Sequence, residues 1–295
     1  MFDTSTKQWY YVLKIKLYYT TKHREFQLYF CFLFKNTDLL LERELIMMNI
    51  LITGCGGRMG RVLSRMCEES DDLNVACGVD PAMPACSYPV YSSCTDVSEK
   101  IDMIIDFSFH AAISDILSYA TKNKIPAVIA TTGFTLEELS LIENAQKSIP
   151  VFRSANMSLG VNLICQLAKK AAKFLPDFDI EIVEKHHNQK VDSPSGTALM
   201  LADEISSVMP YDTNYVLGRQ GICGKRTKEE IGIHAIRGGT IVGEHDVIFA
   251  GQNEVVTISH SAGSREILAN GAICAARFLL GKAPGLYSMK DVFDD

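Results

Sequence analysis

The sequence lacks any Cys-x-x-Cys pair, and its nine cysteines are scattered over 295 residues. An odd number of dispersed cysteines argues against a disulfide framework, and the absence of close pairs argues against a zinc module. We therefore expect free thiols in a reducing compartment, which predicts a cytoplasmic protein with no metal site. No cysteine has neighbours that mark it as a nucleophile.

An excess of positive charge is also missing, because 29 Lys and Arg stand against 35 Asp and Glu and the net charge is −6. This balance gives no general affinity for nucleic acid or for an anionic membrane, and neither is expected as a partner. An anionic substrate would need a local basic site. The hydrophobic fraction of 47% and the length suit a soluble globular protein of one large or two ordinary domains.

Residues 1–46 do not share the pattern of the rest. They are rich in aromatic residues, include the single Trp, and show no period of 2 or 3.6. Their longest apolar run, Tyr29 to Phe34, is too short for a membrane span and poor for a signal peptide. We predict a non-native or disordered extension, with the true start at Met47 or Met48.

A dinucleotide-binding pattern follows. The apolar strand 49–53 leads into the glycine-rich segment 54–60, then into a helix and a second strand, 73–79, which ends in Asp80. The glycines let the backbone approach a pyrophosphate, the helix start supplies N–H groups, and an acid at this offset accepts hydrogen bonds from ribose hydroxyls. The alternative is a glycine turn that only packs the helix on the sheet.

The spacing of this loop is Gly-x-x-Gly-x-x-Gly rather than the usual Gly-x-Gly-x-x-Gly. No Arg stands beside Asp80, which favours NADH, whereas Arg58 in the loop would tolerate the 2′-phosphate of NADPH. The cofactor is therefore expected to be NADH or NADPH, with the preference left open.

Strands and helices then alternate as far as residue 153. Strands are expected at 101–106, 125–130 and 151–152, each followed by Ser, Thr or Asn, and a capping box of Thr135 and Glu138 begins one of the helices between them. Such alternation predicts an α/β fold with a Rossmann-like, doubly wound parallel sheet, in which ligands bind beyond the carboxyl ends of the strands.

The segment 181–198 carries the chemistry. It begins as a strand and contains His186, His187 and Lys190 within five residues, followed by a Pro-Ser-Gly-Thr turn and a helical pattern. Ser195 is a good N-cap, so the N–H groups of the first helical turn suit an anion such as a carboxylate. Two imidazoles, an ammonium group and an anion cradle would bind a dianionic small molecule and donate a proton to it.

Paired histidines alone are more often structural than catalytic, and the conjunction with Lys190 and the cradle favours function here. A zinc site is a weaker alternative, because the helical His-Glu-x-x-His arrangement is absent. In a continued strand, His186 and His187 would also point to opposite faces.

The remaining residues predict an α+β domain with a mixed, largely antiparallel sheet. A helix is expected over 160–174, strands over 232–237, 243–250 and 254–261 with short antiparallel connections, and a loop over 211–230. A final helix, 264–280, with the tail to Phe293 would return to the first domain.

With both halves in view, the chain resembles the 4-hydroxy-tetrahydrodipicolinate reductase (dihydrodipicolinate reductase) family over residues 48–293. The resemblance rests on Glu-x-x-Glu-x-His-His-x-x-Lys-x-Asp-x-Pro-Ser-Gly-Thr-Ala from Glu181 to Ala198. It also rests on four shorter segments, which are 54–59, 130–134, 154–157 and 237–245.

This resemblance implies reduction of 4-hydroxy-tetrahydrodipicolinate to tetrahydrodipicolinate by NAD(P)H with loss of water, in lysine and diaminopimelate biosynthesis. It implies His186 as proton donor and acceptor, Lys190 as second proton donor, and substrate binding by His187, Gly196 and Thr197. The implied cofactor contacts are Gly54, Cys55, Gly56, Gly57, Arg58, Met59, Asp80, Ala130, Thr131, Thr132, Ser154, Ala155, Asn156 and Met157.

The resemblance further implies a homotetramer built through the sheet of the second domain. It divides the chain into a dinucleotide-binding domain over 47–157, rejoined by 267–295, and a substrate-binding and oligomerisation domain over 158–266. Two other functions stay open on the residues alone. A semialdehyde dehydrogenase would need a reactive cysteine with a histidine base, and a dinucleotide sensor would bind NADH without oxidising it.

Overall fold

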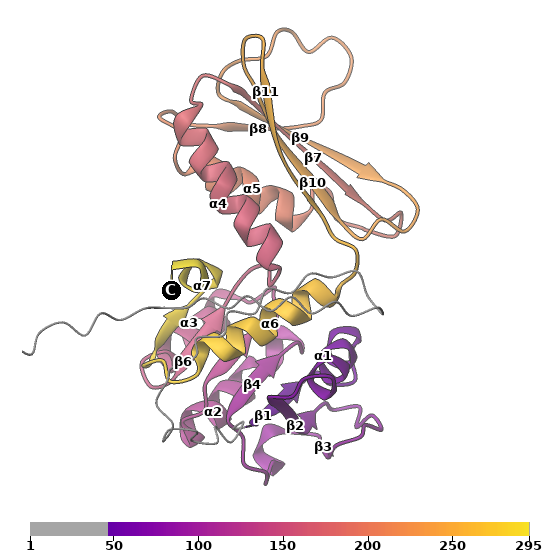
Figure 1. The fold of residues 1–295 in the computed structure, drawn as a ribbon, viewed down its shortest axis with the longest axis vertical. Coiled ribbons are helices and arrows are strands. Elements are labelled where there is room, and N and C mark those ends of the chain that lie inside the picture. Colours follow the sequence, from indigo (N-terminus) through magenta and orange to yellow (C-terminus); the bar gives the residue numbers. More distant parts are fainter. Residues whose placement is uncertain (1–46, 295) are drawn as a thin grey trace, which may run out of the picture. The chain divides into compact units, whose positions relative to one another are not determined.

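The computed structural model describes residues 47–294, and the prediction for residues 1–46 lies outside this part of the chain. A seven-stranded parallel sheet has the strand order β12-β6-β5-β4-β1-β2-β3, which confirms the predicted doubly wound, Rossmann-like architecture (Figure 1). Its strands are β1 (Met48–Thr53), β2 (Leu73–Val79), β3 (Val90–Tyr91), β4 (Met103–Asp106), β5 (Ala127–Ile129), β6 (Pro150–Arg153) and β12 (Gly285–Tyr287).

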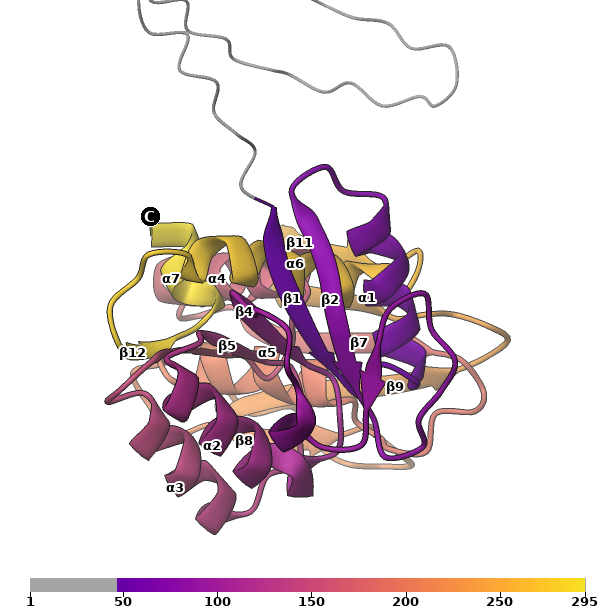
Figure 2. The same ribbon diagram turned by 90° about the horizontal axis from the view of Figure 1, so that it is seen from below.

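Helices cover both faces of this sheet, as Figure 2 shows. One face packs against α1 and α6 through residues such as Leu63 and Ala272, and the other packs against α2 and α3 through Ile116 and Ile142. The helical elements are α1 (Arg58–Glu68), η1 (Cys94–Asp96), η2 (His110–Ala112), α2 (Ile113–Asn123), α3 (Leu136–Ala145), α6 (Glu266–Leu279) and α7 (Met289–Asp294). Because both faces are covered, the central strands are continuously apolar rather than alternating.

The C-terminal segment returns to the first sheet. Strand β12 pairs in parallel with β6, and Arg277 of α6 binds Asp72 at the start of β2 with Nη2 to Oδ1 at 2.7 Å. No helix in residues 47–294 is long and apolar enough to cross a membrane.

The second sheet has five strands in the order β11-β10-β7-β9-β8, and α4 and α5 cover one of its faces (Figure 1). Its pairings are mixed, with β10 antiparallel to β7 and β11, and β9 parallel to β7 and β8. The elements are α4 (Leu159–Phe174), β7 (Asp179–His186), α5 (Gly196–Ser206), β8 (Asn214–Leu217), β9 (Glu230–Arg237), β10 (Glu244–Ala250) and β11 (Val255–Ser261).

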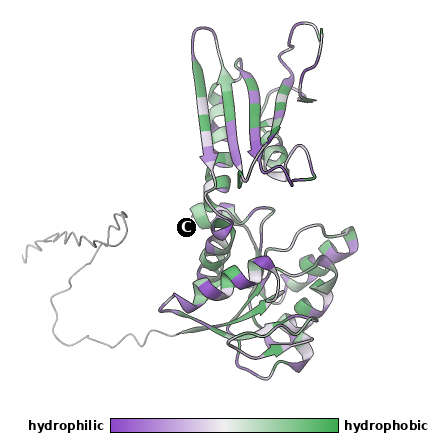
Figure 3. Cartoon of the chain, turned by 90° about the vertical axis from the view of Figure 1, so that its right-hand side faces the viewer, coloured by the Kyte–Doolittle hydropathy of each residue, from purple (hydrophilic) through white to green (hydrophobic). Residues whose placement is uncertain are grey.

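Strands β7 and β10 of this sheet alternate between buried and more exposed residues, because one face is covered by helices and the other is open (Figure 3). In β7 the buried side chains are those of Ile180, Ile182, Glu184 and His186. The predicted helix start at Ser195 is confirmed, since its Oγ accepts the N–H of Ala198 at 3.2 Å. The capping box of Thr135 and Glu138 is confirmed as well.

Two details of the second sheet differ from the prediction. The segment 211–230 is not all loop, because β8 lies within it and pairs with β9. The strands around 232–237 and 243–250 are not neighbours either, because β7 lies between β9 and β10. β8 pairs in parallel with the next strand across the connection 218–229, and β7 is distant in sequence from both β9 and β10, so no local turn pattern reveals either pairing.

Candidate active site

The connection between β7 and α5 brings the predicted catalytic residues together. His186 is the last residue of β7, His187 and Lys190 follow in the connection, and Thr197 lies in the first turn of α5. All four line one cavity of about 210 Å³. The cavity wall also includes Asn156, after β6, and residues at the start of α6, so segments from both predicted domains meet here.

A buried ionic cluster supports this connection. Glu184 is completely buried, and its two oxygens accept hydrogen bonds from Arg237 of β9, at 2.7 Å each. Burial acts to raise the pKa of Glu184, but the hydrogen bonds from Arg237, His186 and the Ser195 N–H outweigh it and hold that pKa below its usual range. Glu184 is therefore an ionised carboxylate in contact with His186 of the cavity wall.

Four histidines surround the cavity, namely His186, His187, His245 and His260. The Nδ1 atoms of His187, His245 and His260 are buried and have no hydrogen-bond partner within residues 47–294. Burial lowers the pKa of His245 to about 4, with a further contribution from His186. In the described part of the chain, no group of three or more His, Cys, Asp or Glu residues is arranged to hold a metal ion.

Lys190 and Arg265 are the cationic residues that the described part of the chain contributes to this cavity wall. The Nζ of Lys190 lies 2.8 Å from Oδ1 of Asp192, and this contact holds the pKa of Asp192 below its usual range. Asp192 is itself largely exposed, so the pair is solvated and an anionic ligand can compete for the ammonium group.

A second cavity, of about 400 Å³, lies at the carboxyl ends of β1, β2 and β4, where Gly54, Gly57 and Asp80 contribute to its wall. Gly54 has a φ of +75°, and a side chain there would collide with the backbone of Phe107. The start of α1 has no side-chain cap, which leaves its N–H groups available to a pyrophosphate. These features fit a dinucleotide.

Asp80 has a structural as well as a predicted binding role. Its Oδ2 accepts the N–H of Gly56 at 3.0 Å, and its Oδ1 accepts the N–H of Ala82 at 2.9 Å. The carboxylate therefore holds the glycine loop against the end of β2, with lone pairs left for a ribose hydroxyl.

Comparison with known proteins identifies the family of this chain. The family model described as "Dihydrodipicolinate reductase, N-terminus" matches residues 48–157, and "Dihydrodipicolinate reductase, C-terminus" matches residues 160–293. The chain belongs to the dihydrodipicolinate reductase family. A Rossmann-like domain in this family indicates a nicotinamide cofactor.

Individual relatives of this chain are named as reductases of the same family. The 4-hydroxy-tetrahydrodipicolinate reductase of Caldanaerobacter subterraneus subsp. tengcongensis is 56% identical over 247 residues, covering 84% of this chain and 98% of that protein. The Clostridium tetani reductase is 50% identical over 246 residues, covering 83% and 96%. The dipicolinate-bound dihydrodipicolinate reductase from Paenisporosarcina sp. TG-14 has a TM-score of 0.69 at 25% identity, covering 82% of this chain and 97% of that one.

The residues predicted from the resemblance to this reductase family fall into three groups. His186, His187, Lys190, Thr197 and Asn156 line the smaller cavity, and Gly54, Gly57 and Asp80 line the larger one. The Nδ2 of Asn156 donates to Oγ1 of Thr197 at 3.0 Å, which joins a predicted cofactor residue to a predicted substrate residue. The others line neither cavity: Cys55, Gly56, Arg58, Met59, Ala130, Thr131, Thr132, Ser154, Ala155, Met157 and Gly196.

Among that third group, Cys55 and Met157 are buried in the core, so only their backbone atoms are suited to a ligand. Residues that sequence reasoning left without a role in this reductase site are Glu184, Arg237, His245 and His260. One signal for Glu184 was present, because a period of 2 puts this carboxylate on the same face as Ile180, Ile182 and His186.

Proposed function

We propose that this chain reduces 4-hydroxy-tetrahydrodipicolinate to tetrahydrodipicolinate with loss of water, using NADH or NADPH, in lysine and diaminopimelate biosynthesis. The observation that carries the proposal is the small cavity, which gathers His186, His187, Lys190 and Thr197 beside Asn156. Family membership and relatives that carry this name over nearly their whole length support the same reaction.

The substrate has two carboxylates, and the cavity offers cationic and N–H groups to them. Lys190 provides an ammonium group, and the first turn of α5, with Gly196 and Thr197, provides N–H groups at the positive end of the helix. The imidazole of His187 adds a donor. The dipicolinate bound to the Paenisporosarcina relative is a planar dicarboxylate, which supports this assignment.

His186 and Lys190 are the proposed proton donors. The Nδ1 of His186 lies 2.7 Å from the Glu184 carboxylate, so Nε2 is the ring nitrogen left for a ligand in the cavity. A nicotinamide cofactor, when bound, would supply the hydride for the cyclic imine. Through Nε2, the His186 imidazole is suited to act as the general acid of the reduction.

The larger cavity favours NADH over NADPH. The charged residues in its wall are Asp80 and Asp115, both acidic, and no Lys or Arg of the described part contributes to that wall. A 2′-phosphate would therefore meet negative charge in this wall, with Arg58 outside it, whereas a ribose hydroxyl would find an acceptor in Asp80.

A homotetramer assembled through the second sheet is part of the proposal. Large apolar side chains are exposed on its strands, including Leu217, Ile236, Val255 and Val256. Sedimentation equilibrium is expected to give four chains per particle, and a monomer at micromolar concentration would contradict this assembly.

One assay tests the proposed reaction. NADH and NADPH oxidation is followed with freshly generated hydroxytetrahydrodipicolinate, for the wild type and for Lys190→Ala. Loss of a positioned proton donor is expected to lower kcat about 10²- to 10⁴-fold, and the KM for NADH is expected to be lower than that for NADPH.

The control is Lys185→Ala, in which a neighbouring lysine paired with Glu244 and Asp246 is removed away from the cavity. It should keep wild-type turnover. A wild type that binds NADH but does not oxidise it with this substrate would favour the dinucleotide sensor instead. Loss of turnover on thiol alkylation would favour a semialdehyde dehydrogenase.

A further inference from the structure

Glu184 contacts both parts of the proposed substrate site. Its Oε2 lies 2.7 Å from Nδ1 of His186, and its Oε1 accepts the N–H of Ser195 at 3.0 Å. Ser195 is the N-cap of α5, immediately before Gly196 and Thr197. One buried carboxylate therefore touches the proposed proton donor and the start of the proposed carboxylate cradle.

We infer that Glu184 is a positioning residue for the reductase reaction, which fixes the tautomer of His186 and the position of the α5 N-terminus. The inference rests on the proposed function, because it concerns the proton that His186 donates. Glu184 itself is completely buried and lies outside the cavity wall, so it acts through other residues.

The tautomer follows from the chemistry of the contact. An ionised carboxylate only accepts hydrogen bonds, so Nδ1 of His186 must carry the hydrogen at this contact. The second proton of the imidazolium then resides on Nε2, the nitrogen left for the cavity. The negative charge of Glu184 stabilises that imidazolium, since opposite charges in contact favour the charged form.

Arg237 limits this stabilisation. It donates to both oxygens of Glu184, and its Nη2 also donates to the carbonyl oxygen of Asp192 at 2.8 Å. The guanidinium offsets part of the carboxylate charge next to His186, and its bond to Asp192 anchors the connection that carries Lys190. The charged and titratable groups around His186 are Glu184 on β7, Arg237 on β9, His245 on β10, and His187, Lys190, His260 and Arg265 in the same cavity wall.

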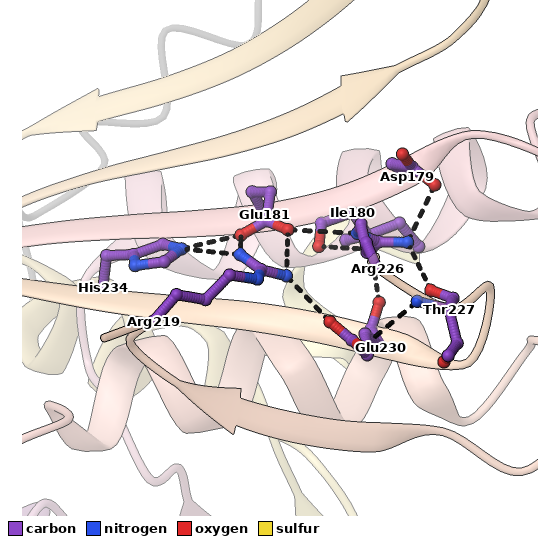
Figure 4. Close-up of polar contacts among 8 residues, drawn as sticks. All are labelled: Asp179, Ile180, Glu181, Arg219, Arg226, Thr227, Glu230 and His234. Atoms are coloured by element: carbon purple, nitrogen blue, oxygen red, sulfur yellow. Dashed lines mark hydrogen bonds and ion pairs between the residues drawn. The ribbon is translucent and has the colours of Figure 1, made fainter. Parts of the chain in front are cut away.

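The open face of the same sheet provides a matched control. Glu181 also accepts two hydrogen bonds from an arginine, Arg219, and contacts a histidine, His234, at 2.7 Å (Figure 4). One additional bond to Glu181 comes from Nε of Arg226. Glu181 therefore has the same Glu-Arg-His chemistry as Glu184, but on the face that carries no cavity residue.

The experiment measures kcat and the pH dependence of kcat/KM for wild type, Glu184→Gln, Glu184→Asp, Arg237→Gln and Glu181→Gln. Loss of an orienting partner is expected to lower kcat of Glu184→Gln about 10- to 100-fold. Loss of the carboxylate charge should also move the alkaline limb of its profile to lower pH by about one unit. Glu184→Asp keeps the negative charge. Its kcat should therefore lie between those of Glu184→Gln and the wild type, and its alkaline limb should stay at the wild-type pH.

Arg237→Gln should move the alkaline limb in the opposite direction, because it removes a positive charge while His186 and the Ser195 N–H still favour the Glu184 carboxylate. This variant also tests the inference if Glu184→Gln does not fold. Glu181→Gln is expected to keep the wild-type pH profile, whatever it does to stability. Such opposite shifts are not expected from two changes that merely loosen the same buried cluster.

Different results would contradict the proposed function and the proposed role of Glu184. A wild type without turnover contradicts the proposed function. A wild type with turnover, combined with a Glu184→Gln variant of unchanged kcat and unchanged limb, overturns the role of Glu184 alone. Shifts of the same sign in Glu184→Gln and Arg237→Gln would also overturn it.

Discussion

A single glycine leaves space for Nε2 of His186, the ring nitrogen of the proposed proton donor. A Cβ built on Gly243 would lie 3.1 Å from Nε2 of His186, closer than ordinary contact, and no backbone strain forbids a side chain there. The methyl group added by Gly243→Ala should therefore displace Nε2 of His186 or block access to it. Small misplacements of a reacting group are costly, so we expect kcat to fall about 10- to 100-fold, measured by NADH oxidation with the substrate.

The control for this change lies in the same connection between β9 and β10. A Cβ on Gly238 meets no atom within 4 Å, so Gly238→Ala should keep wild-type turnover. The free energy of unfolding of both variants, measured in denaturant titrations, should lie within about 1 kcal/mol of the wild-type value. An equal fall in kcat for both would show that the connection, rather than the space beside His186, determines the rate.

At the scale of elements, local patterns predicted much of the fold. Period-2 alternation identified β7, Ser195 marked the start of α5, and Thr135 with Glu138 marked the start of α3. Each of these signals lies within a few residues of the structure it predicts, so neighbouring sequence was sufficient.

The elements that were missed depend on distant partners. Strand β8 is short and mostly half-exposed, and its pairing with β9 rather than its own composition makes it a strand. The short connection between β9 and β10 suggested a hairpin, but β7 pairs with both of them. Because β7 lies between β9 and β10, Arg237 of β9 contacts Glu184 of β7. The sequence spacing of these residues therefore did not predict the buried cluster.

At the scale of the whole molecule, the two proposed binding regions come from segments far apart in sequence. Asn156 follows a strand of the first sheet and binds Thr197 of α5, which covers the second sheet, and α6 contributes to the same cavity. The motifs indicated which residues take part. Their assembly around one cavity of the described chain required the coordinates, because it depends on the C-terminal return of α6.

That assembly makes stability sensitive to acid through His245. This residue is almost fully buried between His186 and Ser195, and burial lowers the pKa of His245 from 6.5 to about 4. The unfolded chain therefore binds a proton that the folded chain excludes between these two values. Folding stability should be complete above pH 6.5 and should fall as the pH drops toward 4, by at most about 1.4 kcal/mol per pH unit.

His245→Gln tests this dependence, because an amide keeps a hydrogen bond to Ser195 Oγ but does not titrate. We expect the free energy of unfolding of the wild type to fall more steeply from pH 7 to pH 5 than that of the variant, in urea titrations at each pH. All other titrating groups are common to both chains, so the difference between the two slopes reports His245. Parallel slopes would mean that His245 is already protonated, or exposed to solvent, in the folded protein at pH 5.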